Sequence, residues 1–154
     1  MSPVKNIATN KKARYDYKII DKFEAGIVLL GSEVKSLREG NGNIKESYVK
    51  FLKKELWLIG MHIAEYSHSG HNSHTPVRDR KLLLHRRELI NLRKKVDVKG
   101  VTMVPLSMYF KNGIVKVEFG LARGKKNWDK RQSIMKKDIE RQTQRSYKGQ
   151  KISL

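Results

Sequence analysis

The chain has no cysteine among its 154 residues. It therefore forms no disulfide bond, carries no thiolate nucleophile and lacks cysteine ligands for zinc, which fits a reducing compartment. Long hydrophobic runs are also missing. Apolar runs such as Ile27–Leu30 are too short to cross a bilayer, and Met1–Lys12 lacks the apolar stretch of a secretion signal. We therefore expect a soluble cytoplasmic protein with no membrane partner.

Acidic residues are scarce in this sequence. It has 15 Asp and Glu against 34 Lys and Arg, which gives a net charge of +19 and a pI near 10.2. Nucleic acid is the leading partner for such a chain, because an anionic membrane would require a basic helix with a broad apolar face. The segment Arg123–Leu154 holds 11 basic and 3 acidic residues. Its net charge of +8 leaves +11 for the rest, so the folded part is basic as well.

The length of the chain allows one compact domain and an appendage. A hydrophobic content of 38% suffices for a single modest core, in a domain of roughly 100 to 130 residues. We expect a flexible N-terminus at residues 1–9, a folded unit at 10–123 and a basic C-terminal tail at 124–154. We also expect a monomer.

Several segments have the composition of β-strands. The segment Tyr17–Leu30 is rich in β-branched and aromatic residues, which predicts a long bent strand with a bulge or bend at Gly26. Two short apolar runs at Tyr48–Leu52 and Leu56–Gly60 flank a polar connection and predict an antiparallel hairpin. A second hairpin is predicted for residues 101–110 and 114–121. Asn112 and Gly113 stand between these two runs, and both residue types tolerate the positive φ of a tight hairpin turn.

Two segments are predicted to be helical. The segment Arg80–Val96 carries apolar residues at the spacing of one buried helix face, namely Leu82, Leu89, Leu92 and Val96. A shorter helix is predicted at Glu33–Glu39, with Ser32 as its N-cap and glycines at its end. Short strands with few helices among them predict a mainly β fold. We expect a small closed β-barrel of the oligonucleotide-binding (OB) type with two or three helices, because closure removes exposed strand edges.

No catalytic or metal site can be assembled from the sequence. The stretch from Gly120 to Lys125 is one residue short of a phosphate-binding loop, and it lacks the hydroxyl residue that must follow the lysine. Three histidines, at 68, 71 and 74, stand in a Ser/Gly/Asn-rich loop that is typical of a solvated segment rather than a rigid zinc site. We therefore expect no enzyme, no metal and no cofactor.

Two stretches near the N-terminus are candidates for RNA contact. The run from Asn10 to Tyr15 combines an amide, three cations and an aromatic ring, which suits phosphates and an unpaired base. The alternative is a frayed basic arm. Further on, small neighbours leave the carboxylate of Glu24 accessible, so it could accept a hydrogen bond from a base amino group. An ordinary exposed strand glutamate is the alternative for Glu24.

Two further segments combine cations with a defined geometry. Lys35 and Arg38 are three residues apart and share one face of the predicted short helix, which is otherwise an ordinary solvated face with salt bridges to Glu33 and Glu39. In the segment GKKNWDKR, Trp128 stands among cations at the exit of the domain. It is predicted either to stack on a base or to pack back on the barrel.

Six motifs occur in order along the chain: NKKA, FEAG, GSEVKSLREG, RKLLL, YFKNG and GKKNWDKR. This ordered set, from Thr9 to Arg131, resembles the SsrA-binding protein family, also called small protein B. Members of that family bind transfer-messenger RNA (tmRNA) in trans-translation, the bacterial rescue of ribosomes stalled on messages without a stop codon. The resemblance implies an OB-type barrel and contact of Asn10, Glu24, Leu83 and Lys116 with the tRNA-like domain of tmRNA.

The resemblance also implies that the segment after Arg123 lies on the small ribosomal subunit, with Trp128 near the decoding nucleotides. Other implied partners are small-subunit RNA and, through the tmRNA complex, elongation factor Tu. The RNA-binding residues predicted from both lines of reasoning are Asn10, Lys11, Lys12, Arg14, Tyr15, Glu24, Lys35, Arg38, Leu83, Lys116, Arg123, Lys125 and Lys126. The residues predicted to contact the ribosome are Trp128, Asp129, Lys130, Arg131, Lys137, Arg141 and Arg145.

The tail can also be considered as an isolated helix. At 100° per residue its cations fall on one stripe, with Trp128, Met135 and Ile139 nearly opposite. Burial of so few apolar groups does not offset the entropy lost when the chain is ordered. We therefore expect the tail to be helical only when bound.

Two other functions remain open for this sequence. One is a ribosomal protein or general RNA chaperone built on the same barrel. The other is a nuclease or RNA-modifying enzyme, which no residue set supports.

Overall fold

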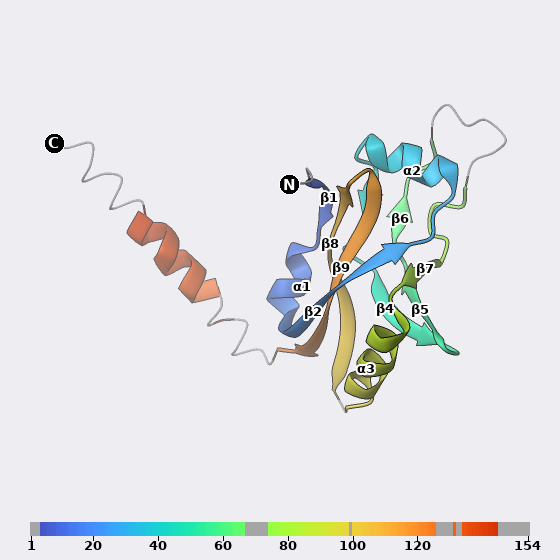
Figure 1. Ribbon diagram of the computed structural model, residues 1–154. Coiled ribbons are helices and arrows are strands. Elements are labelled where there is room, and N and C mark those ends of the chain that lie inside the picture. The colour runs from blue at the N-terminus through green and yellow to red at the C-terminus, as the bar shows by residue number, and fades with distance from the viewer. Residues whose placement is uncertain (1–3, 67–73, 99, 126–130, 132–133, 145–154) are drawn as a thin grey trace.

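A computed structural model of the chain describes residues 4–66, 74–98, 100–125, 131 and 134–144 (Figure 1). The elements, in chain order, are β1 (Val4–Thr9), α1 (Lys11–Asp16), β2 (Tyr17–Ile27), α2 (Gly31–Arg38), β3 (Gly42–Asn43), β4 (Tyr48–Leu52), β5 (Glu55–Ile59), β6 (His62–Ile63), β7 (Arg80–Leu83), α3 (Arg86–Val96), β8 (Val101–Lys111) and β9 (Ile114–Gly124). Residues 134–144 are also helical.

Antiparallel pairing joins the strands into a near-closed ring. The strand order is β1-β8-β4-β5-β7-β2-β9, and β9 pairs back with β8. The first strand, β1, lies beside β8 outside this ring, and β3 pairs with β6 in a small second sheet. The predicted mainly β fold is therefore confirmed. The weakest link in the ring is between β4 and β8, which pair only through Val49 and Met103.

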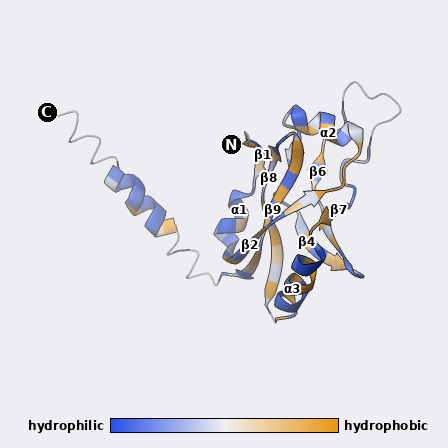
Figure 2. Ribbon diagram, viewed as in Figure 1, coloured by the Kyte–Doolittle hydropathy of each residue, from blue (hydrophilic) through white to orange (hydrophobic). Residues whose placement is uncertain are grey.

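The core of the protein fills the inside of the ring. Buried side chains come from alternate positions of the long strands, such as Val115, Val117 and Phe119 on β9. Leu37 of α2 and Leu92 of α3 are also fully buried, so these two helices add their apolar faces to the same core. Figure 2 shows that hydrophobic residues concentrate on the strands, whereas the helix at residues 134–144 is mostly hydrophilic.

Both predicted hairpins are confirmed. Strands β8 and β9 pair from Lys111 and Ile114 outward, and Asn112 and Gly113 in the turn have φ values of 54° and 74°. Strands β4 and β5 pair antiparallel, and Lys53 in their turn has a φ of 59°. The β8–β9 hairpin was predictable because its tight turn requires a positive φ, which Asn and Gly both tolerate. The β4–β5 hairpin was predictable from its two apolar runs and the polar connection between them.

The predicted helix at Arg80–Val96 is wrong over its first four residues, which form strand β7. Arg80 and Leu82 are buried because β7 lies between β5 and β2 and pairs with both. The register with these two strands outweighs the local helical spacing of the apolar residues. Leu84 and His85 connect the strand to the helix, and only Arg86–Val96 is helical as predicted; α3 turns Leu92 into the core.

Two smaller features also differ from the sequence predictions. The bulge in β2 lies between Ile19 and Asp21 rather than at Gly26, which stays in register. The N-cap of α2 is Leu30 rather than Ser32, because the carboxylate of Glu33 accepts a hydrogen bond from the Leu30 amide at 2.8 Å.

The N-terminal segment forms a strand, and part of the C-terminal tail forms a helix. Residues 4–9 form β1 instead of a flexible end, because β1 pairs with β8 and packs Ile7 against the core. Residues 134–144 form a helix, and every residue along that range is exposed. That the tail is helical only when bound stays a prediction.

Candidate nucleic-acid interface

One row of residues crosses the outer face of four neighbouring strands. Gly26 of β2 pairs with Leu83 of β7 on one side and with Lys116 of β9 on the other, and Lys116 pairs in turn with Tyr109 of β8. Residues directly opposite each other on paired strands share a face of the sheet. Leu83 is 50% exposed, whereas Leu82, its neighbour in sequence, is buried. The row therefore faces away from the core.

The carboxylate of Glu24 lies next to this row. Glu24 precedes Gly26 by two residues on β2, so both are on the same face of the strand. The Tyr109 hydroxyl donates a hydrogen bond to Oε2 of Glu24, and Nζ of Lys111 lies 3.5 Å from Oε1. The side chain of Glu24 thus spans β9 and reaches β8.

The surroundings keep Glu24 ionised. The hydrogen bond from Tyr109 lowers the pKa of Glu24, and the positive charges of Lys111 and Lys116 lower it further, against a smaller opposing effect of burial. Burial and the neighbouring carboxylate of Glu24 in turn raise the pKa of Tyr109, so that its proton stays on the phenol. At neutral pH, Glu24 is therefore a hydrogen-bond acceptor held in place by a permanent donor.

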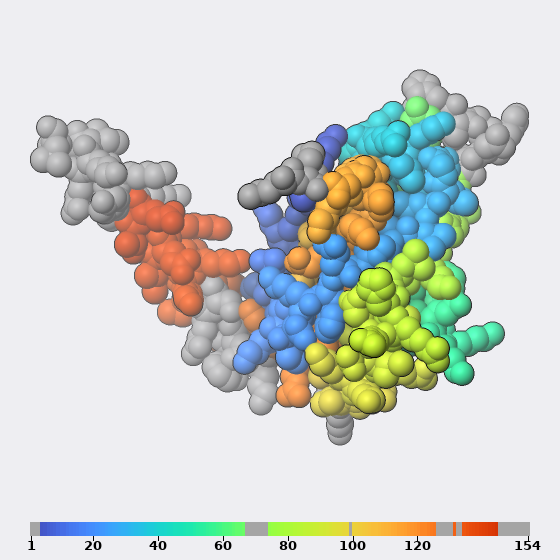
Figure 3. All heavy atoms as spheres, in the orientation of Figure 1, coloured from blue at the N-terminus to red at the C-terminus, as the bar shows by residue number. Residues whose placement is uncertain are grey.

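Glu24, Leu83 and Lys116 line a single hollow of about 710 Å³. Its remaining lining mixes apolar and polar side chains: Lys22, Phe23, Gly26, Ile27, Leu84, His85, Glu88 and Ile114. Figure 3 shows β2, the tip of the β8–β9 hairpin and the start of α3 side by side on one face of the molecule. Three of the four residues that the family resemblance placed on the RNA, distant in sequence, thus meet in one place.

Asn10, the fourth of these residues, lies elsewhere and is 3% exposed. Its Oδ1 accepts a hydrogen bond from the amide of Ala13 at 3.2 Å and so caps α1. Its Nδ2 donates to the carbonyl oxygens of Pro105 at 3.0 Å and Ile44 at 3.4 Å. The side chain of Asn10 therefore forms its hydrogen bonds with the protein backbone, and it stabilises the first turn of α1.

The other N-terminal candidates lie on helix α1, so the alternative of a frayed basic arm is wrong for this segment. Lys11, Lys12, Arg14 and Tyr15 are all exposed. Lys12 lies 3.7 Å from Glu46, and the Lys125 ammonium donates to the Arg14 carbonyl at 3.2 Å. This last contact joins α1 to the end of β9, close to exposed Arg123, in a second basic cluster apart from the hollow.

The remaining candidates are distributed over α2 and the tail. Lys35 and Arg38 are exposed on α2, and the Lys35 ammonium lies 5.7 Å from the centre of the Tyr66 ring. Arg131, Lys137 and Arg141 are exposed helical residues of the tail. The other tail candidates lie outside the described residues: Lys126, Trp128, Asp129, Lys130 and Arg145.

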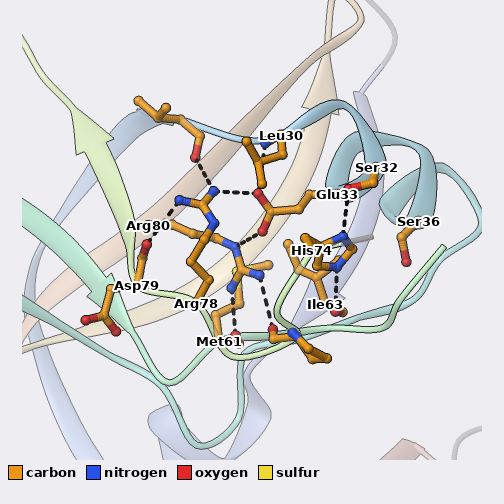
Figure 4. A network of polar contacts seen from close by, with 12 residues as sticks. Leu30, Ser32, Glu33, Ser36, Met61, Ile63, His74, Arg78, Asp79 and Arg80 are labelled. Atoms are coloured by element: carbon orange, nitrogen blue, oxygen red, sulfur yellow. Dashed lines mark hydrogen bonds and ion pairs between the residues drawn. The ribbon is translucent and has the colours of Figure 1, made fainter. Parts of the chain in front are cut away.

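A buried polar network supports the end of the ring beneath α2 (Figure 4). Glu33 and Arg80 are both fully buried and form an ion pair, and Arg78 donates to the other oxygen of the same carboxylate. Arg80 also donates to the carbonyl of Met61 at 2.7 Å. The alternative reading of α2 as an ordinary solvated face paired Glu33 with Lys35 or Arg38, whereas Glu33 is buried and pairs with Arg78 and Arg80. The sequence analysis missed this network because the arginines come from a segment more than forty residues away.

His74, one of the three histidines considered for a metal site, is buried in the same region. Its Nε2 donates to the Ile63 carbonyl at 2.9 Å, and its Nδ1 lies 2.9 Å from the Ser32 hydroxyl. Both ring nitrogens therefore serve the protein's own structure. His68 and His71 are outside the described residues. Across the described ranges, no group of His, Cys, Asp or Glu is arranged to hold a metal ion.

The sequence analysis also missed Tyr109, Lys111 and Gly26, which complete the surroundings of Glu24. The register of the β8–β9 hairpin was a usable signal, since it places Tyr109 opposite Lys116.

Among the helices that the structure describes, none is long and apolar enough to span a membrane.

The near-closed ring of strands and the basic outer face with its mixed hollow define a mainly β, nucleic-acid-binding type of protein. A family model described as SmpB protein matches residues 7–149. The chain is 53% identical to the SsrA-binding protein of Sulfurihydrogenibium sp. (strain YO3AOP1), over 97% of this chain and 98% of that protein. It is 49% identical to the SsrA-binding protein of Dehalococcoides mccartyi (strain BAV1), over 96% of this chain and 86% of that protein.

A solved structure also resembles the chain. It comes from work called "tmRNA-SmpB: a journey to the center of the bacterial ribosome", with a TM-score of 0.65 and 48% sequence identity over 78% of this chain and 85% of that one. The chain therefore belongs to the SmpB family, the non-enzymatic tmRNA-binding proteins that act with the ribosome in trans-translation.

Proposed function

We propose that this protein binds the tRNA-like domain of tmRNA and delivers it to stalled ribosomes for trans-translation. The observation that carries the proposal is the convergence of Glu24, Leu83 and Lys116 on one outer hollow. An ionised acceptor, an exposed apolar side chain and a cation together can recognise the base, ribose and phosphate of a folded RNA. The names of the relatives support tmRNA as the RNA in question.

The folded unit at residues 10–123 acts in this proposal as an OB-type barrel that holds the RNA. Support comes from the ring of antiparallel strands: because β9 pairs back with β8, the exposed strand edge belongs to β1, outside the ring. RNA binding by OB-type barrels commonly uses the outer face of the strands. The protein acts as a monomer in the cytoplasm and meets elongation factor Tu only through the RNA complex.

The tail at residues 124–154 serves as the ribosome-directed part. Lys137 and Arg141 are four residues apart and share one face of the helix at 134–144, while Met135 and Ile139 share the opposite face. Met135 and Ile139 are 61% and 60% exposed, so most of the surface of these two side chains stays open to a partner. Such a helix can enter an empty message channel lined by phosphates. A channel that already holds a message excludes it by steric competition.

Truncation after Arg131 tests the division between barrel and tail. Binding to the tRNA-like domain should stay nearly unchanged, whereas peptide tagging on stalled ribosomes should be abolished. Equal loss of both activities would refute the division.

Sequencing of the RNA that copurifies with the protein tests the RNA partner. One dominant small stable RNA is expected, whereas bulk ribosomal RNA would favour a ribosomal protein or general RNA chaperone instead.

The salt dependence of binding tests the role of the cations. If about five phosphates are neutralised, log K should fall with log salt concentration at a slope near −4. Lys125→Ala should make that slope shallower by about one phosphate contact, at about 0.7 to 0.9 per contact. An unchanged slope would remove Lys125 from the interface.

A further inference from the structure

Gly26 is a glycine that the fold itself does not require. Its φ is not among the positive values found at Gly40, Gly60, Gly100 and Gly113. A Cβ at Gly26 would approach no atom closer than 3.5 Å, which is an ordinary contact with Leu83. Gly42 and Gly120 are different, since a Cβ there would come within 2.7 and 3.0 Å of packed side chains. Neither backbone conformation nor internal packing explains the glycine at position 26.

A glycine at this place also weakens the sheet. Gly26 is paired on both sides, with Leu83 of β7 and with Lys116 of β9, so it stands where the ring joins β7 to β9 through β2. Glycine in a paired strand loses more conformational freedom than other residues and contributes no side chain to cross-strand packing. A glycine inside a strand often marks a bulge, a tight bend or a close approach by a ligand or another backbone. A bulge is excluded at Gly26, because it pairs with both neighbouring strands without a shift of register.

The missing side chain leaves the hollow open at its centre. Leu83 flanks Gly26 on one side and Lys116 on the other, because both are its cross-strand partners. Glu24 stands two residues along the same face of β2. The opening therefore has an apolar wall, a cationic wall and an ionised acceptor at one end, all lining the same hollow.

This combination fits an unpaired nucleobase better than a phosphate. A flat base can lie against bare backbone with one edge on Leu83, as bases do on apolar and aromatic platforms. Base amino groups are donors, and the ionised carboxylate of Glu24 only accepts. The two lysines that line the hollow, Lys22 and Lys116, are balanced by Glu24 and Glu88, so the lining carries no net positive charge to attract a phosphate.

We propose that Gly26 is a specificity-determining residue of the RNA interface: the absence of its side chain admits one unpaired base of the RNA, whose amino group faces Glu24. This inference rests on the proposed function for the identity of the RNA. The inference adds two points to that function. Gly26 contacts the RNA only through its backbone, and the group that it admits is an unpaired base.

A graded series of substitutions tests the inference, with a transcript of the tRNA-like domain as the probe and the full-length protein. Gly26→Ala, Gly26→Val and Gly26→Leu fill the hollow by increasing amounts. Affinity should fall in that order, and Gly26→Leu should bind about tenfold or more weakly, the size of losing one stacked base. The salt slope should remain that of the parent, because no phosphate contact is removed.

Gly31→Leu is the matched control. Gly31 also lacks a positive φ, has open space around its Cβ position and is not part of the hollow. It should bind the transcript like the parent. Chemical probing of the bound transcript should show one base that is protected by the parent and by Gly31→Leu, and exposed again with Gly26→Leu. Gly26→Ala keeps the test available if the larger side chains disturb folding.

Two results would overturn the inference. Parental affinity of Gly26→Leu would show that nothing occupies the hollow over Gly26, while the proposed function would stand because the parent still binds. An equal loss with Gly31→Leu would show that the effect is not specific to the hollow. Failure of the parent itself to bind the transcript would instead refute the proposed function, and the inference with it.

Discussion

Glu33 and Arg80 form an ion pair from which solvent is completely excluded, since both residues have an exposed fraction of 0%. The carboxylate belongs to the first turn of α2 and the guanidinium to β7, so the pair ties a helix to the wall of the ring. Arg78 and the amide of Leu30 complete the bonds to the carboxylate.

Removal of the Glu33 charge should destabilise the protein strongly. Glu33→Gln leaves Arg80 buried without its anion, and such a loss costs about 3 to 5 kcal/mol of unfolding free energy. Urea denaturation followed by circular dichroism measures the change. Glu39→Gln, an exposed acid at the end of the same helix, is the control and should change stability by less than about 0.5 kcal/mol. Equal effects of both substitutions would contradict a special role of the buried pair.

The same pair predicts how stability depends on pH. Burial raises the pKa of Glu33, but the hydrogen bonds from Arg78, Leu30 and Arg80 outweigh this effect and hold it below the ordinary value of 4.5. A carboxyl whose pKa is depressed by folding stabilises the protein above its unfolded pKa, and this contribution is lost as the pH falls through the folded pKa.

The free-energy difference between the parent and Glu33→Gln should therefore be constant from about pH 7 to about pH 5. It should shrink below pH 4.5 as the carboxyl of the parent becomes protonated. Denaturation curves at several pH values measure this difference. A difference that grows towards acid pH would mean that the folded state binds the proton of Glu33 more tightly than the unfolded state does.

Asn10→Ala should act on stability rather than directly on RNA contact. The substitution removes the N-cap of α1 and leaves the carbonyls of Ile44 and Pro105 without their donor. We expect a loss of about 2 kcal/mol. RNA affinity of the folded protein should change little. Asn91→Ala, at an exposed position of α3, should shift stability by less than about 0.5 kcal/mol. A large loss of affinity at unchanged stability would show that Asn10 contacts the RNA itself.

Tyr109→Phe should weaken RNA binding through Glu24. Without the phenolic hydrogen bond, which is the largest cause of the depressed pKa of Glu24, that pKa should rise towards 4.5. The carboxylate also loses its fixed position, and one such hydrogen bond corresponds to about fivefold in affinity. NMR titration of the Glu24 carboxyl and RNA binding at neutral pH measure the two effects. Tyr48→Phe, at an exposed tyrosine of β4, should leave both unchanged.

Local signals explain why several elements could be predicted. Asn112 and Gly113 specify a tight turn by their own backbone preferences, so the β8–β9 hairpin follows from the sequence whatever surrounds it. The spacing of Leu89, Leu92 and Val96 likewise identifies the buried face of α3. The excess of positive charge already predicted a nucleic-acid partner.

Arg80–Leu83 illustrates what local signals cannot decide. Leu82 continues the helical spacing of α3, yet the segment forms a strand that pairs with β5 and β2 and buries Arg80 and Leu82. Only the completed ring creates this pairing. The same applies to Glu33, whose partners Arg78 and Arg80 are far away in sequence.

The sequence alone determined the charge of this protein, its two tight hairpins and the amphipathic face of α3, because these depend on the residues within one short segment. The tertiary structure decided where Glu24, Leu83 and Lys116 meet, which carboxylate is buried, and that Gly26 stands open between its two strand partners. Those relationships depend on the register between strands distant in sequence. Register is set by the burial of side chains in a shared core, which no single segment contains.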